Sequence, residues 1–466
     1  MLVLILILLN SQNAFSDELL NSPAKASTTK TTKTSSSTNL PKGPSRKAVT
    51  SETKAVTSET PSFNTQPSVN NLGSIDSGRK ATYGEPSPRP LSPSPSNDLI
   101  GLGADKLWRI KPGFDFKTAY DSNVNREPPG QQNSDVIFSY IPSIDVHRRG
   151  TKLDVKAGYQ MNFQEYVKDS DQNAFNHTAK GVVKYTGNKI KTILSESFSW
   201  AKTYAGDEHS ERTPIFVNSF TREVIYSLTP KVSASTIYNN YIFMYREGTL
   251  KESSYVVNDI GGRVYYHATP KLDLYLHGSG NTTEYYRSHT QDSQGYSILV
   301  GAKGQVTRKL VTDLQTGFKG QTYDNATFNS FYDWVVQGIF QYRLTRKLDT
   351  SLALRRNRQE SVYSNTGWYE ANSLAWGLNY RITSRIYASL DASIQGNRYA
   401  RETTEGTRTK KRKDLLLTGG STLNWRAMRH LLISLGYNYR QRDSNFDNIF
   451  DYVEHVVEST ASYQFS

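Results

Sequence analysis

The chain has 466 residues, of which 36% are hydrophobic and 12% aromatic, and its formal net charge is +13 at pH 7. It contains no apolar run near the ~18 residues that a membrane-spanning helix needs, so helical membrane proteins are excluded. The absence of cysteine excludes disulfides, thiolate metal sites and a lipid-anchored lipoprotein.

The first 100 residues divide into two segments of different composition. Residues 1–16 carry a short apolar core and then Ala14-Phe15-Ser16, whose small residues suit a signal-peptidase cut, so we predict a signal peptide. Residues 17–100 are rich in Ser, Thr, Pro and Lys, and Lys47–Thr53 is duplicated letter for letter at Lys54–Thr60. Such a segment buries too little apolar surface to offset its ordering entropy, so we predict a disordered periplasmic tail.

A turn of similar sequence recurs about every 40 residues over the rest of the chain. The first copy is Thr186-Gly187-Asn188-Lys189, and later copies read Thr-Pro-Lys, Thr-Arg-Lys or Thr-Ser-Arg. A repeat of this size indicates one supersecondary unit copied many times, and here the unit is a β-hairpin. The later copies lie at 229–231, 269–271, 307–309, 345–347 and 383–385.

Apolar and polar residues alternate between these turns. From Leu153 to Gln164, apolar side chains fall on one face of an extended chain and Asp, Lys, Gln and Asn fall mostly on the other. This period of two is typical of a strand with two different environments, and such strands match the ~9–11 residues that cross a bilayer. The polar face is too charged for a packed small barrel and fits the water-filled lumen of a large one. We therefore predict an all-β fold, a transmembrane antiparallel β-barrel over residues 101–466.

The connections predict the size and the orientation of the barrel. Eight short turns and nine longer polar loops predict eighteen strands, with sixteen as the alternative. An even number places both ends of the barrel on one side, and short turns belong to the periplasmic side of such barrels. The predicted location is the bacterial outer membrane, with the N-terminal tail in the periplasm.

The final strand carries an assembly signal. It places Tyr463 and Phe465 on the lipid face at the end of the chain. This ending is similar to the C-terminal signal that the outer-membrane assembly machinery reads, so we expect that machinery as a partner. It departs from the usual pattern in having Thr460 where glycine is common and in adding Ser466 after the last aromatic residue.

A set of charged residues points into the lumen by strand parity. Basic residues precede several short turns and acidic residues follow them, so Arg343 falls opposite Asp349 across a hairpin. One interpretation is cross-strand ion pairs that fix the register, and the other is a charged constriction that selects solutes. Further inward lysines would bias the pore towards anions. The predicted pore-lining charges are Lys111, Lys117, Lys156, Lys184, Lys303, Lys319, Arg343, Arg355, Arg381, Arg426, Asp154, Asp273 and Asp349.

Basic residues also gather in a predicted polar loop at 400–413. The two interpretations are binding to lipopolysaccharide phosphate at the outer rim and a solvated charge run. Nucleic acid is excluded as a partner, because a membrane barrel offers no aromatic-basic recognition module. The candidate lipopolysaccharide-binding residues are Arg401, Arg408, Lys410, Lys411, Arg412 and Lys413.

The sequence lacks catalytic motifs, including Gly-x-Ser-x-Gly, His-Glu-x-x-His and the phosphate loop. His267 and His277 are predicted to point inward on adjacent strands with Asp273 between them. A metal or hydrolase site is one interpretation of this group, and ordinary lumen residues are the interpretation we favour. We therefore predict no enzymatic activity, no cofactor and no metal.

Three features carry a family resemblance. The segment Gly113–Val124 resembles the first strand of the putative β-barrel porin 2 family, whose members often begin with an aromatic-alternating strand ending in Tyr-Asp-(Ser/Asp)-Asn. The turns Leu228–Lys231 and Leu344–Lys347 and the final Tyr-x-Phe are also similar to those of the family. The likeness covers roughly residues 107–465. Several relatives belong to exopolysaccharide or capsule operons, so the resemblance implies a role in passing or anchoring secreted polysaccharide and no catalytic residue.

These observations together predict an outer-membrane channel. We expect a passive conduit for secreted anionic exopolysaccharide, with polysaccharide, periplasmic export partners and outer-membrane lipid as its contacts. A general diffusion porin for small anions is the first alternative, and a non-conducting scaffold that docks a partner is the second. An exporter should be closed at rest, whereas a porin should conduct continuously.

Overall fold

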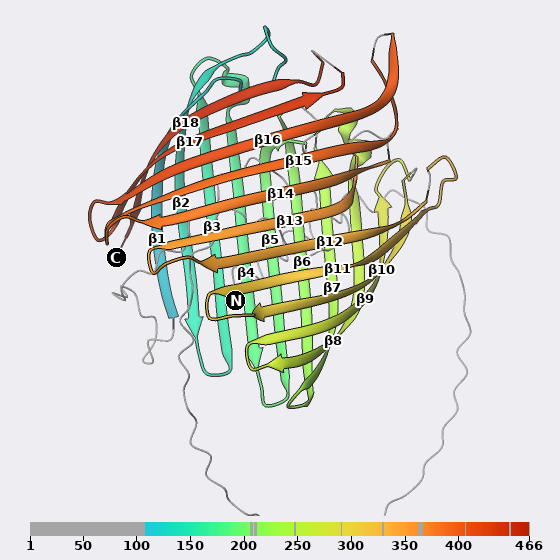
Figure 1. Ribbon diagram of the computed structural model, residues 1–466. Helices are drawn as coiled ribbons and strands as arrows, with labels where there is room; N and C mark the ends of the chain where they lie inside the picture. Colours follow the sequence, from blue (N-terminus) through green and yellow to red (C-terminus); the bar gives the residue numbers. More distant parts are fainter. Residues whose placement is uncertain are drawn as a thin grey trace, which may run out of the picture. The chain divides into compact units, whose positions relative to one another are not determined.

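The computed structural model describes residues 108–465 apart from 206–207, 209–211, 247, 290, 329, 362–366, 406 and 447–448. The described residues form one sheet of eighteen antiparallel strands. Strand β1 pairs with both β2 and β18, so the sheet closes into a barrel (Figure 1). The predicted fold class and the count of eighteen strands are confirmed. The predicted signal peptide at 1–16 and tail at 17–100 lie outside the described residues.

The strands are longer than a membrane crossing requires, and each is joined to the next in chain order. No helix among the described residues is long and apolar enough to cross a membrane. Two short 3₁₀ helices, η2 (Ser170–Gln172) and η3 (Thr249–Ser253), lie in loops. The strands are β1 (Trp108–Asp121), β2 (Asp135–Arg149), β3 (Leu153–Tyr166), β4 (Ala174–Thr186), β5 (Ile190–Tyr204), β6 (Arg212–Thr229), β7 (Val232–Tyr245), β8 (Tyr255–Thr269), β9 (Leu272–Tyr285), β10 (Ser293–Gln305), β11 (Leu310–Tyr323), β12 (Phe331–Arg343), β13 (Leu348–Glu360), β14 (Trp368–Arg381), β15 (Ile386–Glu405), β16 (Arg408–Arg426), β17 (Leu431–Ser444) and β18 (Tyr452–Gln464).

The repeated threonine of the short turns has a structural role. The hydroxyl oxygen of Thr229 accepts hydrogen bonds from the backbone N–H groups of Lys231 and Val232, at 3.2 and 3.0 Å. Thr307 and Thr383 make the same pair of contacts in their own turns. A hydroxyl that satisfies two backbone donors closes a tight turn without further residues, which explains why threonine recurs at this position.

Both described ends of the barrel lie on the short-turn side. Gln464 pairs with Gly113 where β18 meets β1, and the backbone N–H of Phe465 donates to the carbonyl oxygen of Pro112 at 3.1 Å. Tyr463 and Phe465 are exposed on the outer face, with ring centroids 5.0 Å apart. The last strand therefore forms the seam that closes the barrel, and its terminal aromatic residues face outward.

The two faces of each strand differ as the alternation predicts. On β9, Leu274 and Leu276 are 42% and 54% exposed on the outer face, whereas the inward His277 is 3% exposed. Exposed aromatic residues lie on the outer face near both ends of the strands, where the interfaces of a membrane would lie. They include Tyr185, Tyr226, Tyr342, Tyr380 and Trp425 near the short turns and Tyr120, Phe163 and Phe318 near the loops.

The predicted loop at 400–413 is wrong. Strand β15 continues to Glu405 and β16 begins at Arg408, so most of the segment is a paired hairpin, with Glu402 opposite Lys411. The register shifts between Arg398 and Glu402. The sequence did not indicate strand here because charged and polar residues occupy both faces of this hairpin, and backbone pairing needs no apolar alternation.

Gly304 lies where the backbones of two neighbouring strands approach each other closely. It has φ +132°, and a Cβ atom at this position would lie 2.1 Å from the carbonyl oxygen of Lys271. Gly304→Ala is therefore expected to lower the free energy of unfolding by about 2–4 kcal/mol, because it adds backbone strain to a backbone clash. Urea titration of tryptophan fluorescence in micelles measures the change. Gly396→Ala is the matched control, because a Cβ there meets nothing within 4 Å, and equal stability of the two variants would contradict the clash.

Candidate functional site: the lumen and its loop-side mouth

The strand register places the predicted lumen charges on the inner face. Exposed apolar side chains occupy the alternate positions of the same strands, such as Phe116 on β1 and Leu352 on β13. Their predicted role in selecting solutes stays a prediction. The residues on this face are Lys111, Lys117, Lys156, Lys184, Lys303, Lys319, Arg343, Arg355, Arg381, Arg426, Asp154, Asp273 and Asp349.

Several of these charges form ion pairs. Arg343 pairs with Asp349 across the β12–β13 hairpin, with 3.5 Å between Nε and Oδ1. Lys117 pairs with Glu458 at 2.5 Å across the β1–β18 seam. Lys303 pairs with Asp313 at 3.0 Å between β10 and β11. These pairs join neighbouring strands, as the register-fixing interpretation predicts.

A second group of lumen cations remains without ion-pair partners. Asp154 lies opposite Lys184 in the register, but its carboxylate contacts Nε2 of His147, at 3.3 Å. The members of the group lie on β1, β3, β4, β14 and β16, within a few residues of the short-turn end of each strand. These cations form an arc of positive charge on one side of the short-turn entrance, from β14 through β18 and β1 to β4. Within the described parts of the chain, the cations that form no ion pair include Lys111, Lys156, Lys184, Arg381 and Arg426.

The inward histidines do not form a common site. His267 contacts Asp273 at 2.7 Å through Nδ1 and the hydroxyl of Ser233 at 2.9 Å through Nε2. His277 instead contacts the carbonyl oxygen of Gly262 at 3.1 Å. No group of three metal-ligating side chains occurs among the residues that the structure describes. His267 and His277 are therefore separate lumen residues, each held by its neighbours.

The loop-side mouth has a different character from the turn-side entrance. Aromatic residues pack together on its inner wall, where Tyr255 and Tyr285 have ring centroids 5.4 Å apart and Phe243 stacks on Tyr255 at 5.7 Å. These residues come from the loop ends of β7, β8 and β9. The cluster also includes Ala205, Ile215, Tyr241, Tyr245 and Val257.

Glu360, at the loop end of β13, draws strands of this wall together. Its carboxylate accepts hydrogen bonds from Gln321 at 2.8 Å, from Tyr285 at 3.3 Å and from Tyr323 at 3.4 Å. The partners lie on β9 and β11, so one carboxylate connects three strands that are not adjacent to one another. Several hydrogen bonds to one charged acceptor fix the position of the strand end.

The next residue, Ser361, makes a contact that crosses the mouth. Its hydroxyl donates to Oε1 of Glu208 at 2.7 Å, and Glu208 lies in the connection between β5 and β6. Strands β5 and β13 stand on nearly opposite walls of the ring (Figure 1). Both side chains are buried, at 1% exposure each. The contact therefore bridges the loop-side opening of the barrel.

A further network, centred on Arg126 in the β1–β2 loop, ties the loops to the seam. The guanidinium lies 3.5 Å from the ring centroid of Tyr204 on β5 and 3.3 Å from the carboxylate of Glu454 on β18. The hydroxyl of Tyr204 donates to the carbonyl oxygen of Val124 in the same loop. Arg440 on β17 also binds Glu454, at 2.5 Å. This network holds the β1–β2 loop against strands on both sides of the seam.

The basic side chains of segment 400–413 do not all point outward to solvent. Arg412 is 1% exposed, pairs with Asp414 at 2.7 Å, and lies 3.7 Å from the ring centroid of Phe450. Arg401 lies over Phe328, and Lys410 lies over Phe446 and donates to the carbonyl oxygen of Asn445. Three of the predicted lipopolysaccharide-binding residues thus contact aromatic residues, because strand alternation sends their side chains to the opposite face from their neighbours. The remaining three, which are exposed, are Arg408, Lys411 and Lys413.

The sequence did not reveal the contacts at the mouth. A glutamate at a strand end and a serine in a loop are ordinary residues, and the partners Glu208 and Ser361 are 153 residues apart. A buried carboxylate at the loop end of a strand requires hydrogen-bond donors, but the sequence does not show which carboxylate is buried or where its donors come from.

Comparisons with known proteins agree with this architecture. The model of the family described as putative beta-barrel porin 2 matches residues 245–465. No curated protein sequence matches the chain.

Three solved structures illustrate the likeness. The outer membrane protein opdK from Pseudomonas aeruginosa has 10% identity, covers 76% of this chain and 99% of its own, and gives a TM-score of 0.42. The siderophore receptor PirA from Pseudomonas aeruginosa is 12% identical to this chain. The alignment covers 76% of this chain and 80% of PirA, with a TM-score of 0.38. OccAB3 from Acinetobacter baumannii has 9% identity, covers 76% of this chain and 99% of its own, and gives 0.41.

The family match covers the part of the barrel from the last residue of β7 to the residue after β18. The match includes the turn Leu344–Lys347 and the final Tyr-x-Phe that carried the resemblance, whereas the opening strand Gly113–Val124 and the turn Leu228–Lys231 lie outside it. Residues 245–465 therefore match the family described as putative beta-barrel porin 2, and the described part of the chain is a porin-like outer-membrane β-barrel.

Proposed function

We propose that this barrel is a gated outer-membrane channel that passes secreted anionic polysaccharide outward. The observation that carries the proposal is the contact between Glu208 and Ser361, which bridges the loop-side mouth. An exporter that conducts only with its cargo needs a closed resting state, and a bridge between opposite walls would favour that state. The choice of polysaccharide as the cargo rests on the family resemblance, since several relatives belong to exopolysaccharide or capsule operons.

The charge of the turn-side entrance supports an anionic cargo. Unpaired cations such as Lys156, Lys184 and Arg426 face the lumen near the short turns. Short turns lie on the periplasmic side in membrane barrels, so this entrance would meet a polymer that arrives from the periplasm. A concentration of like charge at an entrance raises the local concentration of an oppositely charged solute and disfavours solutes of its own sign.

Charge reversal at this entrance tests the selectivity. We expect Lys156→Glu combined with Lys184→Glu and Arg426→Glu to lower the chloride-to-potassium permeability ratio by about tenfold, because the local potential changes sign. Reversal potentials in a KCl gradient across a planar bilayer measure the ratio, in a background that carries Ser361→Ala so that the mouth is open. Arg408→Glu is the matched control, because Arg408 lies at the exposed tip of the β15–β16 hairpin. Equal ratios in the triple variant and the control would contradict a cation-lined entrance.

Block of the open channel by a charged polymer tests whether the cargo is an anionic polysaccharide. We expect an oligogalacturonate added on the short-turn side of the open channel to interrupt the current in discrete events that become more frequent with driving voltage. Neutral dextran of the same length should interrupt it much less often, because it lacks charge to interact with the lumen cations. Equal blocking by the two polymers would remove the electrostatic basis of the proposal. Continuous conductance of the unmodified protein would instead favour the diffusion porin, and silence of every variant would favour the scaffold.

A further inference from the structure

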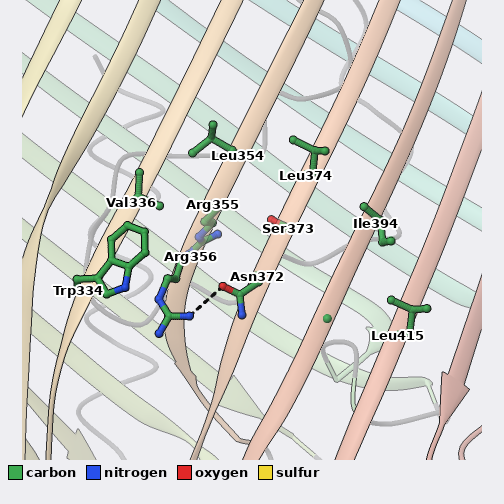
Figure 2. Close-up of a pocket in the computed structure, with 11 residues that line it drawn as sticks. Trp334, Val336, Leu354, Arg355, Arg356, Asn372, Ser373, Leu374, Ile394 and Leu415 are labelled. Atoms are coloured by element: carbon green, nitrogen blue, oxygen red, sulfur yellow. Dashed lines mark hydrogen bonds between the residues drawn. The ribbon is translucent and has the colours of Figure 1, made fainter.

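The outer wall of the barrel carries an apolar hollow near its loop-side end. It spans β12 to β16, is open on its outer side and has a volume of about 500 Å³. Figure 2 shows its floor, and Arg355 and Ser373 of the same strands point to the other side of the sheet. The hollow is therefore on the membrane-facing surface and is separate from the lumen. Its apolar floor consists of Val336, Leu354, Leu374, Ile394 and Leu415.

The hollow exists because one position on the outer face has no side chain. Gly396 lies between Asn372 on β14 and Leu415 on β16 in the register, and all three belong to the outward row. A Cβ atom added to Gly396 would meet no heavy atom within 4 Å. The space above this glycine is thus open, and a larger side chain would fill it without disturbing the sheet.

Two cations lie one outward position closer to the loops. Arg398 on β15 is directly opposite Lys413 on β16, and both side chains are exposed. Neither side chain forms an ion pair or a hydrogen bond with another of the described residues. The edge of the hollow that faces the loops therefore carries two adjacent positive charges, and neither takes part in an ion pair among the described residues.

Arg356, which also lines the hollow, differs from Arg398 and Lys413 because it forms ion pairs. Arg356 binds Glu370 at 2.6 Å and Asp333 at 3.1 Å, and it also donates to Asn372 at 3.2 Å (Figure 2). The carboxylate of Glu370, which lies opposite Arg398 in the register, is thus already occupied. Arg356 braces the side of the hollow, while Arg398 and Lys413 remain available to a ligand.

We propose that this hollow binds lipid A, with an acyl chain on the apolar floor and a phosphate between Arg398 and Lys413. Phosphate accepts charge-assisted hydrogen bonds from arginine and lysine, and the apolar floor suits a hydrocarbon chain. The loop side of such barrels faces the outer leaflet, and this assigns the lipid to lipopolysaccharide instead of an inner-leaflet phospholipid. Trp334 also lines the hollow, as expected for an indole at the level of lipid headgroups.

The site differs from the loop that the sequence indicated. It keeps Lys413 of the predicted set, adds Arg398, and leaves out Arg412, which is buried with Asp414. The two cations meet because β15 and β16 pair in register at this level, immediately before the irregularity that begins at Arg398.

Two variants and one control test the site. The full chain, purified in detergent, is incubated with Kdo₂-lipid A, and native mass spectrometry measures the bound fraction. Arg398→Ala combined with Lys413→Ala should weaken binding by about tenfold or more, since two charged contacts to phosphate are lost. Gly396→Leu, which fills the hollow and leaves both cations in place, should also weaken binding. Arg222→Ala removes an exposed outward cation on β6, far around the barrel, and should bind as the unmodified protein does.

The expected pattern is loss of lipid A in both site variants, retention in the control, and unchanged heat-modifiable migration in gels for all three. Three results would overturn the proposal. They are absence of lipid A from the unmodified protein, equal binding by the site variants and the control, and displacement of lipid A by an equal concentration of phosphatidylglycerol. The last result would assign the hollow to anionic phospholipid in general.

Discussion

Ser361→Ala is expected to raise the conductance of the barrel in a planar bilayer by about tenfold, because it removes the hydrogen bond that bridges the mouth. The hydroxyl of Ser361 donates to the carboxylate of Glu208 on the opposite wall, at 2.7 Å. A hydrogen bond to a charged acceptor contributes about 1.5–3 kcal/mol, and about 1.4 kcal/mol corresponds to a tenfold shift between closed and open states. Single-channel recordings at low voltage measure the open probability directly.

A cross-link provides the complementary experiment. The chain has no cysteine, so Glu208→Cys combined with Ser361→Cys creates the only two thiols in the protein. A short bifunctional thiol reagent should join them and hold the channel silent, and cleavage of the reagent should restore the conductance. Each cysteine variant alone, treated with the same reagent, serves as the control. Conductance that is unaffected by the cross-link would show that ions pass elsewhere and would refute the bridge as a gate.

Arg126→Ala is expected to lower the free energy of unfolding by about 3 kcal/mol, at the lower end of the range for removal of one partner from a buried ion pair. Arg126 is 3% exposed and contacts Glu454 at 3.3 Å and the ring of Tyr204 at 3.5 Å from its centroid. The loss is limited because Arg440 still neutralises Glu454, at 2.5 Å. Urea unfolding in micelles, followed by tryptophan fluorescence, measures the change.

Arg149→Ala is the matched control for this measurement. Arg149 ends β2 on the short-turn side and is exposed, so its removal should change the stability by less than about 0.5 kcal/mol. A double variant, Arg126→Ala with Glu454→Gln, should not recover the loss, because Arg440 then loses its own carboxylate partner. Equal stability of Arg126→Ala and Arg149→Ala would show that the Arg126 network does not hold the seam.

Much of the barrel follows from local sequence patterns. The alternation along Leu153–Gln164 determines which side chains face the lumen, because successive residues of a strand point to opposite faces whatever surrounds them. The repeated threonine turns divide the chain into hairpins, and in-register pairing across a hairpin brings Arg343 to Asp349. Such predictions succeed because the residues involved are neighbours in the chain.

The segment 400–413 shows where local patterns stop being informative. Its charged residues lie on both faces of a hairpin, so composition gave no sign of strand, and the role of each cation depended on which face it occupied. Arg412 turned inward to Asp414 and Phe450, and Lys413, the next residue, faced outward beside Arg398. Alternation assigns opposite faces to adjacent residues, but only the register of the pair fixes which of them lies inside.

The sequence by itself determined the strand pattern, the turns, the number of strands and the inward position of the lumen charges, because each depends on interactions between residues close in the chain. The tertiary structure alone decided the bridge between Glu208 and Ser361, the Arg126 network and the hollow above Gly396. The first two join parts of the chain that meet only when the sheet closes on itself, and the third depends on the lateral register of five strands. Contacts of this kind leave no periodic signal, since their spacing along the chain is set by the circumference of the barrel and not by the repeat of a strand.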